Sequence, residues 1–258
     1  MLILKEQPLK LHTALALLAI SMGILLALPQ AAAEESLALA VAAGFMQPFK
    51  EMVDHFEAAT GTTVQATFAS TGSLYNQIRN GAPYDIYLAA DEERPNLLHK
   101  ASLAVEPFPY ARGRVILWSA NQDFCGPDTW QEALQTGNPN TIALVNPVTG
   151  PFGAAAMAAL EAADLNQDLE IRFVIAQTVA QSFQYASTEA VAAGFCAQSA
   201  LATEQGKNGC YYTIPEAPPV MMNAAILTRT EQREAAESFA AFLLSHEAGL
   251  IKESWGFH

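Results

Sequence analysis

Short apolar runs of strand length alternate along this chain with segments whose apolar residues recur every three to four positions. In the first half, strand-like runs at residues 37–43, 63–69 and 84–90 are each followed by a helical pattern, and the third of these patterns covers residues 94–104. An order of strand, helix, strand, helix favours an open, mostly parallel sheet with helices on both faces. The alternation therefore predicts an α/β fold.

The same alternation starts again after residue 113. Helical patterns are predicted at 130–134, 152–163, 182–187 and in a last helix with Ala235, Phe239, Phe242 and Leu243 on one face; strands are predicted at 114–119, 141–146, 170–175, 193–197 and 224–229. Two α/β units of about a hundred residues fit this length better than one. Proline-rich stretches at 107–114 and 214–220 are the natural crossings between them. The predicted lobes are 34–112 with 220–258, and 113–219.

The N-terminus has the features of an export signal. Lys5 and Lys10 flank an apolar run that extends from Thr13 to Leu28, and the small residues 31–33 follow it. This pattern predicts a signal peptide at residues 1–33 that is cleaved after Ala33. The alternative is a membrane anchor, because the apolar run nearly reaches the length that spans a bilayer.

Net charge and cysteine content limit the binding partners and the disulfides that this chain can have. The net charge of −13 argues against nucleic acid and anionic membrane as partners. An exported chain with three cysteines can form one disulfide and keep one thiol. Cys196 lies in a buried strand pattern, which indicates that its thiol is inert. A disulfide between Cys125 and Cys210 is then possible, but the sequence does not decide it.

Four turns that follow predicted strands share a small, uncharged composition rich in N–H groups or hydroxyls. Their sequences are AAGFMQ (42–47), ASTGS (69–73), VTGPFG (148–153) and QTVAQS (177–182). The start of a helix presents unpaired N–H donors and partial positive charge, so it can bind an anion without a cationic side chain. Taken alone, Ser70 and Thr71 are more typical of a helix cap than of a ligand site.

Other kinds of site have weaker support. Asp85 and the acidic residues 91–93 can bind a cation, but Asp91 to Glu93 are more typical of the start of a helix. The sequence lacks Gly-x-Ser-x-Gly, a Walker motif and cysteine or histidine spacing for a metal. We therefore predict no catalytic residues and no enzyme activity.

Longer motifs resemble one known family. The stretch FASTGSLYNQIRNGAPYDIYLAADEERPNLL, together with GRVILWS, VAQSFQYASTEAVAAGF and SFAAFLLSHEAGLIKESWGF, is similar to the periplasmic molybdate-binding proteins of ABC transporters. The resemblance implies a type II-like, two-lobed periplasmic binding protein with two crossings between the lobes. It also implies capture of molybdate or tungstate in the interlobe cleft and delivery to a permease in the inner membrane. A periplasmic monomer without a cofactor is expected.

The family's ligand-binding turns coincide with the four turns described above. The resemblance assigns the oxyanion, and molybdenum only as part of it, to these positions: Gly44, Phe45, Ser70, Thr71, Phe152 and Val179. Gly44 stands where relatives offer Ser or Asn, so it admits a water or lets the backbone approach more closely. Ala197 stands where some members add a tyrosine hydroxyl.

Two rival functions remain open. One is a two-lobed receptor for another ligand, such as a sulfate-like oxyanion or ferric iron, with Tyr211 and Tyr212 as the feature that favours iron. The other is an exported α/β hydrolase. A site of donors alone disfavours hydrogen phosphate, whose O–H would lack an acceptor, whereas sulfate has to be excluded by the size of the cavity.

Overall fold

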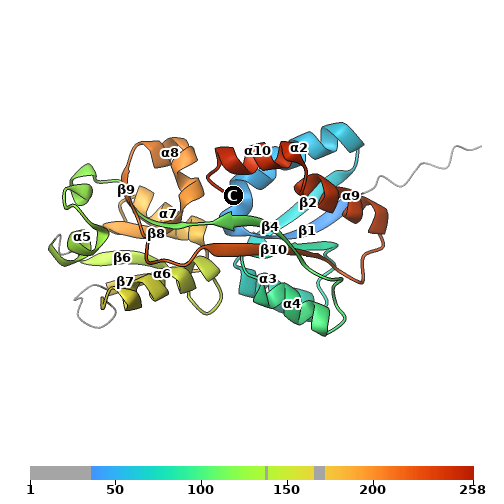
Figure 1. Ribbon diagram of the computed structural model, residues 1–258, viewed down its shortest axis with the longest axis horizontal. Helices are drawn as coiled ribbons and strands as arrows, with labels where there is room; N and C mark the ends of the chain where they lie inside the picture. Colours follow the sequence, from blue (N-terminus) through green and yellow to red (C-terminus); the bar gives the residue numbers. More distant parts are fainter. Residues whose placement is uncertain (1–35, 137–138, 166–171) are drawn as a thin grey trace, which may run out of the picture. The chain divides into compact units, whose positions relative to one another are not determined.

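The computed structural model describes residues 36–136, 139–165 and 172–258, which build two five-stranded sheets (Figure 1). The first sheet has the strand order β2-β1-β3-β10-β4. Its strands are β1 (Ser36–Ala42), β2 (Thr63–Ala69), β3 (Ile86–Leu88), β4 (Phe108–Gly113) and β10 (Val220–Ile226). The second sheet has the order β7-β6-β8-β5-β9. Its strands are β5 (Val115–Ser119), β6 (Thr141–Val145), β7 (Arg172–Ala176), β8 (Ala193–Ala197) and β9 (Cys210–Thr213).

Both sheets are mostly parallel. In the first, β1 pairs in parallel with β2 and β3, while β10 runs antiparallel to both β3 and β4. In the second, β6 pairs in parallel with β7 and β8, while β5 runs antiparallel to β8 and β9. Four of the five strands in each sheet therefore share one direction, and the predicted fold class is confirmed.

Helices cover both faces of each sheet. Figure 1 shows α2, α9 and α10 on one face of the first sheet and α3 and α4 on the other, with α6 and α7 on opposite faces of the second. The helices are α2 (Met46–Thr60), α3 (Thr71–Arg79), α4 (Glu93–Lys100), α5 (Trp130–Thr136), α6 (Pro151–Ala162), α7 (Val179–Ser187), α8 (Glu204–Lys207), α9 (Arg233–Leu243) and α10 (His246–Ser254), and the short 3₁₀ helices are η1 (Ala43–Phe45), η2 (Gln122–Cys125) and η3 (Gln198–Ala202).

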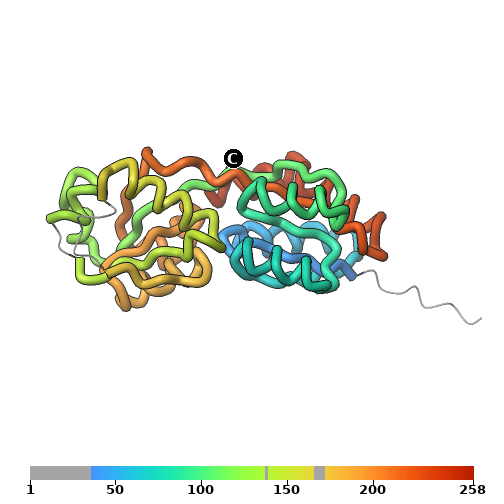
Figure 2. The backbone as a smooth tube through the Cα atoms, turned by 90° about the horizontal axis from the view of Figure 1, so that it is seen from below, coloured from blue at the N-terminus to red at the C-terminus, as the bar shows by residue number. Residues whose placement is uncertain are grey.

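Two chain segments connect the sheets, one from β4 to β5 and one from β9 to β10. Figure 2 shows them next to each other, in green and orange-red, and Val220 is the register partner of Gly113. The stretch 107–114 was expected to be a linker, but most of it forms strand β4. Pro107 precedes this strand, and Pro109 within it is tolerated because β4 is an edge strand. The exact lobe limits stay a prediction.

Several element limits differ from the expectations. Helix α7 begins at Val179 rather than at residue 182, and strand β10 begins at Val220 rather than at residue 224. The predicted helix 94–104 stops at Lys100 because Ser102 adopts a left-handed conformation with φ of 59°. The predicted signal peptide lies outside the described residues. Among the described helices, none combines the length and the apolar character needed to cross a membrane.

The cysteines form the bridge that the sequence left open. Cys125 and Cys210 are joined across 85 residues, and Cys196 is a buried free thiol in β8. Burial raises the pKa of the Cys196 thiol far above its usual value, which keeps it protonated. The prediction of an inert Cys196 agrees with this position.

Candidate functional site

The starts of helices from both sheets meet at one small cavity. The volume open to the centre of a water-sized sphere is ≈ 20 Å³, whereas a single water needs about 10–15 Å³ on this measure. The cavity therefore has the size of a very small ligand. Its lining residues are Ala42, Ala43, Gly44, Ala69, Ser70, Thr71, Ala90, Val145, Gly150, Pro151, Phe152, Thr178 and Val179.

Five of the six predicted ligand residues line this cavity. They come from all four turns that the sequence singled out, and they are Gly44, Ser70, Thr71, Phe152 and Val179. Phe45 is not among the lining residues. Its side chain is fully buried, and its ring meets Tyr110 and Phe257 edge-on, with centroid distances of 4.9 and 5.2 Å. The side chain of Phe45 thus belongs to the core.

Ser70 and Thr71 have different roles at the start of α3. Ser70 is the N-cap, and its Oγ accepts a hydrogen bond from the Ser73 N–H at 3.3 Å and lies 2.8 Å from the Ser73 Oγ. The capping interpretation is therefore correct for Ser70. Thr71 is the first helical residue, and the cap leaves its N–H among the unpaired donors of the first turn.

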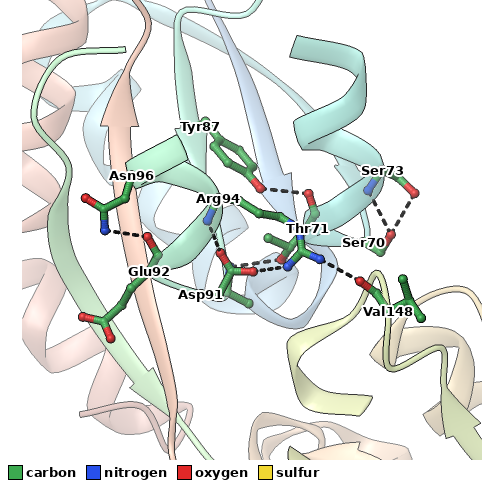
Figure 3. Close-up of polar contacts among 10 residues, drawn as sticks. Ser70, Thr71, Ser73, Tyr87, Asp91, Glu92, Arg94, Asn96 and Val148 are labelled. Atoms are coloured by element: carbon green, nitrogen blue, oxygen red, sulfur yellow. Dashed lines mark hydrogen bonds and ion pairs between the residues drawn. The ribbon is translucent and has the colours of Figure 1, made fainter. Parts of the chain in front are cut away.

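The Thr71 side chain is fixed by its neighbours and is only 1% exposed. Its Oγ1 accepts a hydrogen bond from the Ala90 N–H at 3.1 Å, so the hydroxyl hydrogen remains available to a ligand. The Tyr87 hydroxyl donates to the Thr71 carbonyl at 2.8 Å (Figure 3). Burial and the nearby Asp91 charge raise the pKa of Tyr87 well above its usual value, so Tyr87 stays a donor.

The second sheet contributes the starts of α6 and α7. Helix α6 has Gly150 as its N-cap, without a side-chain hydrogen bond, and Pro151 has no N–H, so Phe152 carries the first donor of this helix. Helix α7 is capped by Thr178, whose Oγ1 accepts from the Gln181 N–H. Because that cap uses a donor further along the turn, the N–H of Val179 is left without an intrahelical partner.

No charged side chain occurs among the described residues that line the cavity. Acidic residues line a neighbouring groove of ≈ 450 Å³, which shares Ala90 and Pro151 with the cavity. There, Asp91 accepts a hydrogen bond from the Arg94 N–H at 3.0 Å and forms an ion pair with its guanidinium (Figure 3). Asp91 thus stabilises the start of α4, as the sequence indicated, and its charge is paired.

Hydrogen bonds cross between elements of the two sheets beside the cavity. Arg94 Nη2 donates to the Val148 carbonyl at 2.7 Å, and the Gly72 N–H donates to the Thr149 carbonyl at 2.8 Å. The sequence analysis placed Gly72, Val148 and Thr149 in two of the four turns, but it missed Arg94 and these contacts. A single arginine after an acidic run gives no signal of its own, because its acceptor is a backbone carbonyl more than 50 residues away.

Ala197 does not line the small cavity; it lines an adjoining one of ≈ 200 Å³ that shares Ala43, Gly44 and Val179 with it. The tyrosines that favoured iron, Tyr211 and Tyr212, belong to the described strand β9. Tyr212 lies on the edge strand β9 and donates to the Pro127 carbonyl at 2.8 Å. Within the described ranges, no group of three or more His, Cys, Asp or Glu side chains is arranged to hold a metal ion.

Comparisons with known proteins agree with this geometry. The family model "Bacterial extracellular solute-binding protein" matches residues 37–258. Two proteins named "Molybdate-binding protein ModA" are similar: that of Azotobacter vinelandii is 33% identical over 93% of this chain and 95% of its own, and that of Rhodobacter capsulatus is 34% identical over 93% of each. The solved periplasmic molybdate-binding protein of Azotobacter vinelandii superposes with a TM-score of 0.81 at 28% identity, covering 86% of this chain and 98% of its own.

Proposed function

This chain belongs to the bacterial extracellular solute-binding proteins, and we propose that it is the periplasmic protein that captures molybdate for an ABC transporter. The protein is a transport component rather than an enzyme. Its partner is the permease of that transporter, to which it delivers the anion. Tungstate, which has the same charge and shape, is the second ligand that the proposal includes.

The observation that carries the proposal is the small uncharged cavity at which the starts of η1, α3, α6 and α7 meet. An anion that enters such a cavity loses its hydration and needs many hydrogen bonds in return. Backbone N–H groups of first helical turns and the Thr71 hydroxyl provide donors of this kind, and the helix dipoles add a favourable potential. A tetrahedral dianion suits this set because all of its oxygens are acceptors.

We assign the oxyanion to the predicted residues in different ways. Thr71 contributes its hydroxyl and its N–H, whereas Gly44, Phe152 and Val179 contribute N–H groups alone. Ser70 contributes mainly by capping α3, and Phe45 has only its backbone to offer, since its side chain lies in the core. Molybdenum is bound solely as the oxyanion, and no cofactor takes part.

The absence of a carboxylate from the lining bears on selectivity. Hydrogen phosphate carries an O–H that requires an acceptor, and the described lining residues present no acidic side chain to accept it. Sulfate is fully deprotonated and shares the shape of molybdate, so the volume of the cavity is the property left to separate the two.

Residues 1–33 form the cleaved signal in this proposal, and the mature protein acts as a monomer without nucleic acid.

Calorimetric titration and thermal unfolding of residues 34–258 test the proposal, with molybdate, tungstate, sulfate, phosphate and ferric citrate at matched ionic strength. A ligand that binds only the folded state adds about 4 kcal/mol of stability at a thousandfold excess over Kd. We expect a large shift with molybdate and tungstate and a small one with sulfate. A shift with sulfate or iron alone would overturn the ligand and leave the fold intact.

A further inference from the structure

The ring of Phe152 is held between two glycines that belong to the other sheet. Phe152 lies in the first turn of α6, whereas Gly44 follows β1 and Gly113 ends β4. A Cβ atom placed on Gly44 would lie 2.8 Å from Phe152 Cε2, and one placed on Gly113 would lie 2.9 Å from Phe152 Cζ. Real Cβ contacts are essentially never this short. The ring therefore fills the space that side chains at both positions would need.

This ring also forms part of the wall of the small cavity. Phe152 is 4% exposed, and it lines the cavity together with Gly44 and Val179. A Cβ on Gly44 would also approach Val179 Cγ1 to 3.1 Å. A polar side chain at position 44 and a phenyl ring at position 152 thus compete for one volume. The sequence analysis left room at Gly44 for a water or a closer backbone, and the structure fills it with the ring.

This inference rests on the proposed function: we propose that Phe152 is a specificity-determining residue. Its ring takes the place of a side-chain donor at position 44 and sets the size of the anion cavity. One residue then does two things. Its N–H is a donor to the anion, and its ring packs between elements of the first sheet. Because both groups belong to the first turn of α6, a movement of α6 relative to Gly44 and Gly113 displaces the ring and the N–H together, which couples anion contact to contact between the sheets.

The coupling has a physical consequence for affinity. Apolar ring atoms at the cavity wall exclude water from one side of the anion, and hydrogen bonds to a charge are stronger where water is excluded. Compared with a site that has a polar side chain at position 44, this site lacks one side-chain donor and has an apolar wall instead. The ring fixes the volume of the cavity, so an oxyanion whose radius does not match that volume makes poorer contact with the donors.

A double-mutant cycle tests the proposal on the mature protein. The variants are Phe152→Ala, Gly44→Ser and the double variant, with Gly249→Ser as the matched control because nothing lies within 4 Å of a Cβ at Gly249. Kd values for molybdate and sulfate and the midpoint of urea unfolding are measured for each. Phe152→Leu serves as the second ring-deleting variant, in case Phe152→Ala does not fold.

We expect each single variant to weaken molybdate binding at least about 10-fold, and Phe152→Ala to reduce the preference for molybdate over sulfate. In the double variant, the serine occupies the space of the ring, so molybdate should bind at least about 10-fold more tightly than the product of the two single effects predicts. The control should bind like the wild type.

The two possible failures can be told apart. Wild-type protein that binds neither molybdate nor tungstate would overturn the proposed function. Wild-type protein that binds molybdate, combined with additive effects in the cycle or with a Gly44→Ser variant of wild-type affinity, would overturn the role of Phe152 alone. The urea midpoints of the four proteins give a second double-mutant cycle that needs no ligand. Gly44→Ser should lower the midpoint of a protein that keeps the Phe152 ring, because the serine clashes with it, and should have little effect in the Phe152→Ala background.

Discussion

Replacing Thr71 by valine separates the hydroxyl from the shape of the side chain. Thr71 is almost fully buried, and its Oγ1 accepts from the Ala90 N–H at 3.1 Å. Since that bond uses the oxygen as an acceptor, the hydroxyl hydrogen is the one donor of this side chain, and both residues line the cavity. Valine keeps the volume, removes the donor to the anion and leaves the Ala90 N–H without its acceptor.

Two different losses follow, and they can be measured separately. A hydrogen bond to a charged group contributes about 1.5–3 kcal/mol, so molybdate should bind about 10- to 150-fold more weakly to Thr71→Val. The buried N–H of Ala90 loses its partner, which should lower the free energy of unfolding of the ligand-free protein by about 1–3 kcal/mol. Thr71→Ser keeps the hydroxyl and should stay close to the wild type in affinity.

Isothermal titration with molybdate gives the first quantity, and urea unfolding without ligand gives the second. The matched control is Thr67→Val, because Thr67 lies on the exposed side of β2 and does not line the cavity. Binding by Thr71→Val within about threefold of the wild type would refute the reasoning, since a loss of that size is below the value of one hydrogen bond to a charged group. Equal losses in Thr67→Val would show that the effect is not local.

Three further predictions use other parts of the structure. The bridge between Cys125 and Cys210 closes a sequence separation of 85 residues, so Cys125→Ser with Cys210→Ser should lower the free energy of unfolding in urea by about 4–5 kcal/mol in the chain-entropy model, with an unchanged Kd for molybdate. Arg94→Met loses the 2.7 Å bond to the Val148 carbonyl, and stopped-flow measurements should show molybdate leaving about 2- to 10-fold faster; an unchanged rate would contradict a role in holding the two sheets together. No described lining residue has an ionisable side chain, so titrations should give Kd values that agree within about twofold between about pH 6 and pH 8.

The sequence was most informative where local chemistry and sheet geometry act together. The stretch before Thr71 indicates a helix start through the capping residue Ser70, and that cap is present in the structure. The Thr178 cap was not recognised, and the helix that it starts was predicted from residue 182 rather than from Val179. Parallel strands place their carboxyl ends along one edge of a sheet, so turns of like composition could be expected to meet there. That rule singled out the four turns, and the family resemblance chose individual positions within them, five of which line the cavity.

Contacts between distant segments could not be predicted in this way. The ring of Phe152 reaches Gly44 and Gly113, which are far from it in the sequence, and a glycine before a helix signals only a turn. The hydrogen bond from Arg94 to the Val148 carbonyl could not be predicted from the residue type at position 148, because every residue has a backbone carbonyl. Strand β4 was missed because Pro107 and Pro109 suggest a linker. Only the pairing of β4 with β10 at the edge of the sheet shows why Pro109 is tolerated there.

The excess of negative charge and the proposed anion ligand are compatible because they act over different distances. Charges on the surface of a protein with net charge −13 are screened beyond about 8–10 Å at physiological ionic strength, so they affect mainly the rate of encounter. The carboxylate that lies nearest in sequence to the cavity lining, Asp91, is paired with Arg94. In the proposed site the anion is bound by N–H groups and a hydroxyl, and a hydrogen bond to a charge is stronger where water is excluded. The rate at which the anion leaves is therefore set by the fixed geometry of a few turns, whatever the charge of the remaining surface.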